Sequence, residues 1–121
     1  MGSAQLDLEH IRRFTGDDDA LVSEVLSMFV EQTGLWLAAL DPSGDDESWS
    51  GVAHALKGSA ASLGAGDLSA LCQRAEDTVG EANAAGVRAF LADEIAAKID
   101  DIKAEIQRWA YAREMRRLKA G

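Results

Sequence analysis

Hydrophobic residues recur along most of this chain at steps of three and four positions, with polar residues between them. The pattern is clearest between residues 20 and 40, where the expected inward positions are Val22, Leu26, Phe29, Thr33, Trp36, Leu37 and Leu40. Such a stripe is typical of an amphipathic helix, and no stretch of useful length shows the alternation of a half-buried strand. The pattern therefore predicts an all-α protein.

Interruptions of this pattern divide the chain into five predicted helices. We expect a short helix over residues 6–14 and four longer ones over 20–40, 48–63, 68–80 and 86–118. The expected inward positions of the last two are Leu68, Leu71, Cys72, Ala75 and Val79, then Phe90 or Leu91, Ile95, Ile99, Ile102, Ile106 and Trp109. Four amphipathic helices with short connections predict an antiparallel up-down four-helix bundle, here with a short extra N-terminal helix.

Aspartate and glycine residues stand at the expected ends of these helices. Asp7 and the aspartates at 17–19 are expected to cap the first two helices, and Asp67 is expected to cap the fourth. The sequence Gly-Ala-Gly-Asp at 64–67 predicts a tight corner after the third helix, because a glycine past a helix end readily adopts the left-handed conformation.

Size and charge limit the possible functions. The 121 residues suffice for one domain, which we place at 6–118 after a disordered start or cloning remnant at 1–5. The net charge of −9 argues against nucleic acid as a partner, because phosphate binding needs a basic surface. No apolar run reaches the length of a membrane span. The single cysteine, Cys72, allows no intrachain disulfide and is expected to be buried, so we predict a cytoplasmic protein with no membrane partner.

The predicted third helix carries the residues with candidate chemistry. At about 100° per residue, one side of this helix gathers Val52, Leu56, Ser59 and Leu63, and the opposite side gathers His54, Lys57, Gly58 and Ala61. Because Leu56 must face the core, His54 must face solvent. The other histidine, His10, stands alone in the first predicted helix and is interpreted as a packing residue.

The neighbours of His54 suit the capture of a phosphoryl group. An exposed imidazole is partly neutral, and therefore nucleophilic, near neutral pH. Lys57 lies one helical turn away and is able to neutralise a phosphoryl oxygen bound to that imidazole. Gly58 costs the helix about 1 kcal/mol relative to alanine, which is best explained by a partner that approaches this face closely.

Residues 53–76, AHALKGSAASLGAGDLSALCQRAE, resemble the histidine-containing phosphotransfer (HPt) domain of multistep two-component signalling. The residues that match the family pattern are His54, Leu56, Lys57, Gly58, Ser59, Leu63, Gly64, Leu68, Cys72 and Glu76. Upstream, LDLEHIRRFTGDDDALVSEVLSMFVEQ is similar to the short helix, acidic turn and long helix of such domains. The resemblance covers residues 6–108.

This resemblance implies that His54 accepts a phosphoryl group from the aspartate of one receiver domain and passes it to another. Lys57 would stabilise the phosphoryl group, and Gly58 would leave room for the partner. The implied partners are receiver domains of hybrid histidine kinases and response regulators. The Mg²⁺ used in such transfers belongs to the receiver, so no cofactor or metal is expected on this chain. No nucleotide-binding motif is visible, so no autonomous kinase activity is expected either.

Members of the family dock receivers through an apolar patch beside the histidine. By this resemblance, the candidate partner-binding residues are Ile11, Phe14, Leu21, Val25, Ala61 and Glu76. Glu76 has two other interpretations, in which its carboxylate holds the imidazole or Lys57, or is simply solvated.

Two other functions stay open at this point. The chain could be an interaction module that binds a receiver without accepting phosphate, although such a module has little reason to keep His54, Lys57 and Gly58 together. It could also be the phosphoacceptor domain of a chemotaxis-type kinase, phosphorylated from ATP by a kinase domain. We expect a monomer, and the boundaries of the pattern favour a whole small protein over an excised domain.

Overall fold

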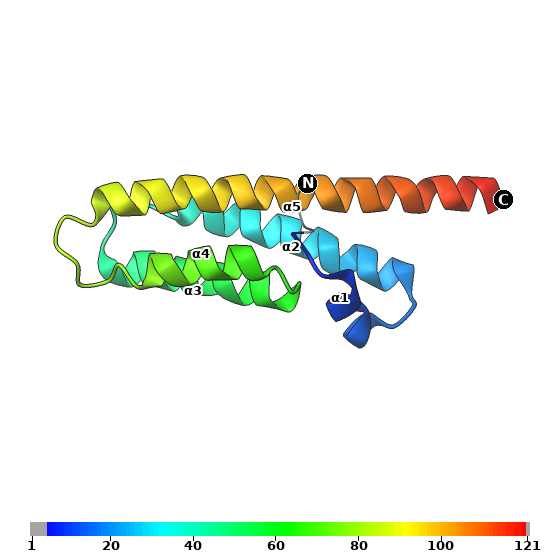
Figure 1. Cartoon of the computed structure of the whole chain (residues 1–121), viewed down its shortest axis with the longest axis horizontal. Helices are drawn as coiled ribbons and strands as arrows, with labels where there is room; N and C mark the ends of the chain where they lie inside the picture. The colour runs from blue at the N-terminus through cyan, green and yellow to red at the C-terminus, as the bar shows by residue number, and fades with distance from the viewer. Residues whose placement is uncertain (1–4, 121) are drawn as a thin grey trace.

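Five helices make up the described part of the protein (Figure 1). The structure is a computed structural model that describes residues 5–120, and it contains no strand within that range. The helices are α1 (Leu8–Thr15), α2 (Asp19–Ala39), α3 (Asp46–Ser62), α4 (Gly66–Glu76) and α5 (Ala85–Ala120). The predictions of an all-α chain and of five helices are therefore confirmed, with small differences at the helix ends.

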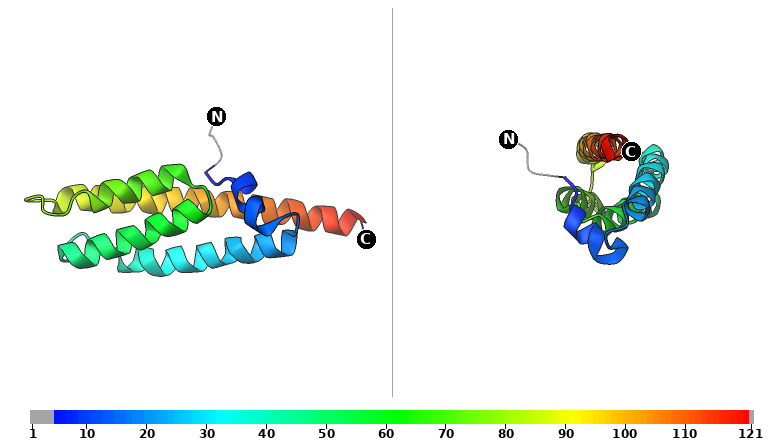
Figure 2. Two further views of the ribbon diagram at one scale, coloured as in Figure 1. Left: turned by 90° about the horizontal axis from the view of Figure 1, so that it is seen from below. Right: turned by 90° about the vertical axis from the view of Figure 1, so that its right-hand side faces the viewer.

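Helices α2 to α5 pack around a common core, and α1 lies against α2 (Figure 2). Each long helix contacts its neighbours in the chain, and α2 also contacts α5, which closes the ring. The C-terminal part of α5 runs on past the other long helices (Figure 1). None of the helices in the described part of the chain combines the length and the apolar character needed to cross a membrane.

The core consists of side chains that are almost completely buried. They are Val22, Leu26, Phe29 and Thr33 of α2, Trp49, Ala53, Leu56 and Ala60 of α3, Leu68, Cys72 and Ala75 of α4, and Leu91, Ile95, Ile99 and Ile102 of α5. Burying one large apolar side chain contributes about 1.5–3 kcal/mol. This shared core therefore determines which face of each helix turns inward and which is left for solvent.

Two predicted inward positions are wrong, because Trp36 is 39% exposed and Val79 is 44% exposed. In α2, Leu37 packs against the core in place of its neighbour Trp36. Val79 is exposed because α4 has already ended before that position. In α5, Leu91 is the inward residue, whereas Phe90 is 56% exposed.

Aspartate side chains cap three of the helix starts. Asp7, Asp18 and Asp45 accept hydrogen bonds from backbone N–H groups in the first turns of α1, α2 and α3. The predicted cap of α4 is wrong: Ala65 occupies the cap position and makes no side-chain hydrogen bond there. Asp67 lies inside the first turn instead, where its charge favours the positive end of the helix dipole.

The predicted corner after α3 is present and requires a glycine. Gly64 has a φ of +66°, and a Cβ at this position would lie 2.7 Å from the Asp7 Cβ. The Asp7 backbone N–H also donates a hydrogen bond to the Leu63 carbonyl (3.0 Å). The absence of a side chain at Gly64 therefore lets the start of α1 rest on the end of α3.

The expected disordered start at residues 1–5 lies largely outside the described residues. Gln5 is described, and its backbone N–H donates a hydrogen bond to Glu105 Oε2 on α5 (2.6 Å). The Gln5 backbone therefore contacts α5, and the domain boundary after residue 5 stays a prediction.

Arg88 of α5 is buried and joins three segments at one end of the bundle. Its Nε donates to Thr78 Oγ1 (2.9 Å), and a terminal nitrogen forms an ion pair with Asp46 at the start of α3. The guanidinium also lies over the Trp49 ring, 5.2 Å from its centre, and Trp49 Nε1 donates to the Ala75 carbonyl (2.8 Å). These contacts fix the start of α3 against the end of α4, and so help to set the register between the two helices.

Candidate functional site

His54 lies midway along α3, on the face turned away from the core. Its side chain is 71% exposed, whereas Ala53 and Leu56 on the inner face are fully buried. Burial of the apolar positions therefore turns the imidazole toward solvent, in the direction that the sequence pattern predicts.

Glu76 of α4 brings a carboxylate against both His54 and Lys57. Its Oε1 atom lies 2.9 Å from Lys57 Nζ and 3.4 Å from His54 Nδ1. The Glu76 side chain is 20% exposed, and Oε1 itself is buried. The Lys57 ammonium therefore supplies the positive charge that a shielded carboxylate needs. Among the interpretations of Glu76, the geometry favours contact with the imidazole and Lys57.

The contact with Glu76 distinguishes the two nitrogens of the His54 ring. Nδ1 faces the carboxylate, which leaves Nε2 on the other edge of the imidazole. A neutral imidazole donates from one nitrogen and accepts at the other, while a carboxylate only accepts. Although 3.4 Å is long for an N–H···O hydrogen bond, the charge of Glu76 favours the form with the proton on Nδ1 and the lone pair on Nε2.

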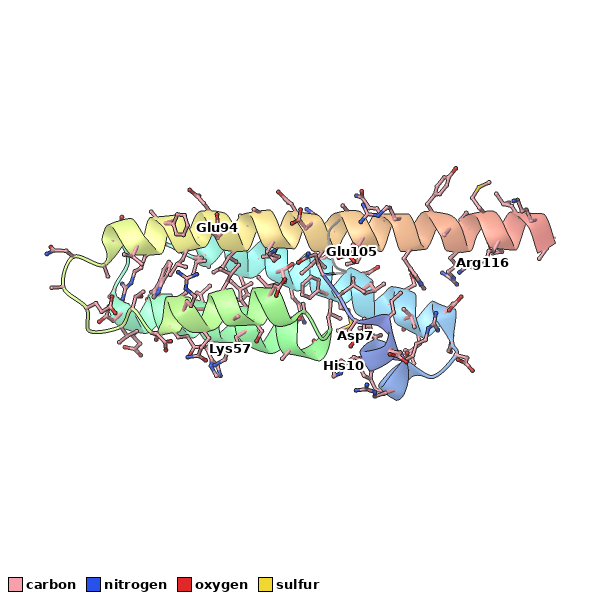
Figure 3. All side chains as sticks on the ribbon, in the orientation of Figure 1. Asp7, His10, Lys57, Glu94, Glu105 and Arg116 are labelled. Atoms are coloured by element: carbon pink, nitrogen blue, oxygen red, sulfur yellow. The ribbon has the colours of Figure 1, made fainter. Side chains whose placement is uncertain are left out.

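Gln73 of α4 and Asp77, the residue just after this helix, complete a polar row beside Lys57. Lys57 lies on the side of α3 and α4 away from α5 (Figure 3). Lys57 Nζ donates a hydrogen bond to Gln73 Oε1 (2.9 Å), and Gln73 Nε2 donates one to Asp77 Oδ1 (2.9 Å). Neither Gln73 nor Asp77 is predicted from the sequence. Their spacing from Glu76 places all three on one helix face, but it does not reveal which residues of α3 they meet.

The helix surface around His54 projects little into solvent, because the neighbouring residues on α3 have small side chains. Gly58 and Ala61 are exposed on the same helix, as is Gly51, one turn before His54. A Cβ added at Gly51 or Gly58 would meet no heavy atom within 4 Å. The packing of this chain therefore does not require glycine at either position, and the space above them is free for a partner. Gly51 is not among the predicted site residues, and its signal in the sequence is a second glycine at helical spacing from His54.

The candidate partner-binding residues divide between surface and core. Phe14 is 55% exposed and Leu21 is 39% exposed, while Val25 is half-buried and Ala61 is exposed. Ile11 must be corrected, because it is completely buried in the core cluster. The short helix α1 turns Ile11 inward and Phe14 outward, which its sequence pattern is too short to reveal.

A small groove between α2 and α3 continues this surface. Its lining residues are Val25, Met28, Phe29, Gln32, Ser59, Ser62 and Leu63. Met28 is 56% exposed. It is not among the predicted site residues, although it lies two helical turns after Leu21 on the same side of α2. An apolar partner surface could therefore contact α2 and α3 together.

The described structure offers neither a metal cluster nor a reactive thiol beside His54. Within residues 5–120, no three His, Cys, Asp or Glu side chains group together so as to hold a metal ion. Cys72 is buried, as predicted, and burial raises the pKa of its thiol to about 12, with a further contribution from the negative charge of Glu76. Cys72 is therefore a packing residue under the site.

Comparison with known protein families agrees with this geometry. A family model of the Hpt domain matches residues 20–109, which include α3, α4, all of α2 but its first residue, and the larger part of α5. The match contains His54, Lys57 and Glu76. It does not contain α1, so residues 6–19 of the resemblance lie outside it. No curated protein and no solved structure matches the chain. Because the family model matches most of the chain, the protein belongs to the Hpt domain family, which serves histidine phosphotransfer in phosphorelays.

Proposed function

We propose that this protein is a phosphorelay intermediate that accepts a phosphoryl group on His54 from a receiver-domain aspartate and passes it to another receiver aspartate. One observation carries the proposal. His54 is the only histidine within the matched residues 20–109, and its side chain is 71% exposed beside Lys57. The other histidine, His10, belongs to α1 and lies outside the matched range.

The transfer uses Nε2 of His54 as the nucleophile. The Nε2 lone pair attacks the phosphorus of the aspartyl phosphate, so that the N–P bond forms as the P–O bond to the aspartate breaks and its carboxylate leaves. In the second transfer a carboxylate of the next receiver attacks the phosphorus, the N–P bond breaks, and the imidazole is restored. Nδ1 keeps its proton throughout, because Glu76 faces that edge of the ring.

Charge and position account for the roles of the residues around His54. Phosphoryl transfer depends mainly on alignment and on neutralising the oxygens of the transferred group. Lys57 supplies a positive charge one helical turn from His54, and Glu76 orients the imidazole and keeps Lys57 close. Gly58 leaves open space above α3 for the active-site loops of the receiver.

The proposed docking surface lies on α1, α2 and α3 beside His54. Phe14, Leu21, Val25 and Ala61 contribute to it, and the exposed Met28 extends it toward the groove. The proposed partners are the receiver domains of hybrid histidine kinases and of response regulators. Exposed apolar residues rimmed by polar ones are the usual centre of such a contact.

Several other properties follow from this function. The chain acts as a phosphohistidine carrier without kinase activity of its own, and the Mg²⁺ of the transfer is held by the receiver. We further propose a cytoplasmic monomer with the long helices in an antiparallel up-down order. Sedimentation at micromolar concentration tests the monomer, because a stable dimer there would contradict it.

The proposal is tested with a receiver domain that carries labelled phosphate on its aspartate. The charged receiver is mixed with wild-type protein and with a His54→Gln variant, and acid-labile, base-stable phosphate is measured on each. Label on the wild type alone is the expected result and would identify His54 as the carrier. Equal label on the wild type and the variant would show that a residue other than His54 is the phosphoacceptor.

Absence of label on both proteins, across several receivers, would favour one of the two alternatives. A kinase catalytic domain with ATP then separates them. Label from ATP on His54 would make the chain the phosphoacceptor domain of a chemotaxis-type kinase. No label from either donor would leave a receiver-binding module.

A further inference from the structure

The Lys57 ammonium is held at two points, only one of which carries charge. Nζ lies 2.9 Å from Glu76 Oε1, and it donates a hydrogen bond of 2.9 Å to Gln73 Oε1. The Lys57 side chain is 26% exposed, although lysine side chains ordinarily extend their charged ends into water. Helix α4 therefore holds this ammonium beside His54 on a side chain that is only partly exposed.

Asp77 determines which way the Gln73 amide points. An amide presents an acceptor oxygen on one side and a donor NH₂ group on the other. Asp77 Oδ1 accepts from Gln73 Nε2 at 2.9 Å, which leaves Oε1 to face the ammonium. In the reversed orientation, donors would meet donors at Lys57 and acceptors would meet acceptors at Asp77. The three side chains therefore form a chain of hydrogen bonds with one favoured direction.

We propose that Gln73, oriented by Asp77, is a positioning residue that holds Lys57 ready for phosphoryl capture at His54. This inference rests on the function proposed above. Gln73 acts through Lys57 and does not need to touch the phosphoryl group. It keeps Nζ near the imidazole before the phosphoryl group arrives, so that the side chain is already partly ordered when transfer begins.

A neutral amide suits this role better than a second carboxylate. An ammonium has three N–H donors, and Gln73 Oε1 takes one of them. Glu76 Oε1 pairs with Nζ through charge and accepts no hydrogen bond, so N–H donors are left for a phosphoryl oxygen. A carboxylate at position 73 would add a negative charge that competes for Lys57 and repels the phosphoryl group. Gln73 therefore holds the cation without cancelling its charge.

The first test compares a Gln73→Leu variant with the wild-type chain. Leucine keeps a side chain of similar size and removes the acceptor. His54 is loaded with phosphoramidate, whose P–N bond breaks as the Nε2–P bond forms and ammonia leaves, so receiver docking plays no part. The initial rate of loading is expected to fall about two- to fivefold, as for the loss of one exposed hydrogen bond. Gln107→Leu, the same change at an exposed site on α5, is the matched control and should load at the wild-type rate.

The second test asks whether Gln73 acts only through Lys57. In a Lys57→Ala background, Gln73→Leu is expected to cause no further loss of rate, because the group that it positions is gone. An equal loss in both backgrounds, or no loss in the wild-type background, would overturn the positioning role.

Failure of this inference is distinguishable from failure of the proposed function. Wild-type protein that takes label from neither phosphoramidate nor charged receivers would overturn the proposed function, and this inference with it. Wild-type protein that is labelled on His54, with losses that add independently in the two variants, would overturn the inference alone.

Discussion

The Lys57 ammonium and the Glu76 carboxylate form an ion pair of 2.9 Å between α3 and α4, directly beside the exposed imidazole of His54. The pair places one positive and one negative charge close to any group bound to the ring. A phosphoryl group attached to His54 would be attracted by the first charge and repelled by the second. Removing the positive charge should therefore disfavour the phosphorylated form of His54, and removing the negative charge should favour it.

Lys57→Ala is expected to slow the transfer of phosphate from a charged receiver by about fivefold. This corresponds to about 1 kcal/mol of charge stabilisation, the scale of a unit charge near a largely exposed site. The fold should remain intact, because Lys57 contributes no core side chain. Rapid-mixing kinetics measures the rate, and circular dichroism checks the fold. Unchanged kinetics in a folded variant would remove Lys57 from the mechanism.

Glu76→Gln is expected to shift the equilibrium with a charged receiver toward phosphorylated His54, again by about fivefold. Glutamine keeps an oxygen that can accept from Nδ1, but it removes the charge that neutralises Lys57 and repels the phosphoryl group. The measurement is the fraction of labelled chain at equilibrium. Glu47→Gln removes the same charge from an exposed site in the first turn of α3 and should leave that fraction unchanged. A shift toward the receiver in Glu76→Gln would contradict this account.

Gly58→Ala is expected to separate stability from function. A Cβ at Gly58 would meet nothing within 4 Å, so alanine should raise the free energy of unfolding by about 0.5–1 kcal/mol through its higher helix propensity. Transfer from a receiver should nevertheless become slower, because the methyl group occupies space that the partner needs. Gly34→Ala in α2, where a Cβ also has open space, should stabilise the protein without slowing transfer. Equal transfer rates in both variants would show that Gly58 provides no clearance.

Cys72 is expected to be unreactive in the folded protein. Burial raises the pKa of its thiol to about 12, against an ordinary value of 9.0, so at about pH 8 the reactive thiolate is absent from the folded state. A thiol-specific reagent should label the native protein very slowly and the unfolded protein rapidly. Because the folded state raises the pKa of Cys72, it favours the protonated thiol. The resulting contribution to the free energy of unfolding is complete below the unfolded value of 9.0 and is lost as the pH rises from there toward about 12. Rapid labelling of the native protein would contradict the burial of Cys72.

The sequence alone predicts the features of the site that depend on one helix. The buried positions of α3, such as Leu56, determine which face is left for His54, Lys57 and Gly58, so their exposure follows from periodicity. The tight corner at Gly64 is also predictable, because a glycine after a helix is a local signal.

Other features depend on how two helices lie against each other. The hydrogen bond between Lys57 and Gln73 requires a particular register between α3 and α4, which the pattern of neither helix contains. Arg88 belongs to a residue type that is mostly exposed, and its burial depends on Thr78 and Asp46, far from it in the sequence. Val79, which the pattern places on an inward face, lies at the surface because α4 ends at Glu76.

The ion pair of Asp46 with the buried Arg88 predicts an acid-sensitive contribution to stability. The hydrogen bond from Arg88, together with one from the Gly80 backbone N–H, lowers the pKa of Asp46 below its ordinary value of 3.8. A carboxyl group with a lowered pKa stabilises the fold above its unfolded value, and this stability is lost as the pH falls through the folded value. Asp46→Asn should therefore unfold at a lower urea concentration than the wild type at neutral pH, and the difference should shrink once the pH falls below 3.8.

Urea unfolding of both proteins across this pH range measures the effect of Asp46. Asp100→Asn, at an exposed position on α5, provides the control for the loss of one negative charge and should follow the wild type at every pH. If the difference in unfolding free energy between Asp46→Asn and the wild type stays constant as the pH falls below 3.8, the charge of Asp46 does not provide the stabilisation. The hydrogen bonds alone, which asparagine partly keeps, would then hold the end of α4 against α3 and α5.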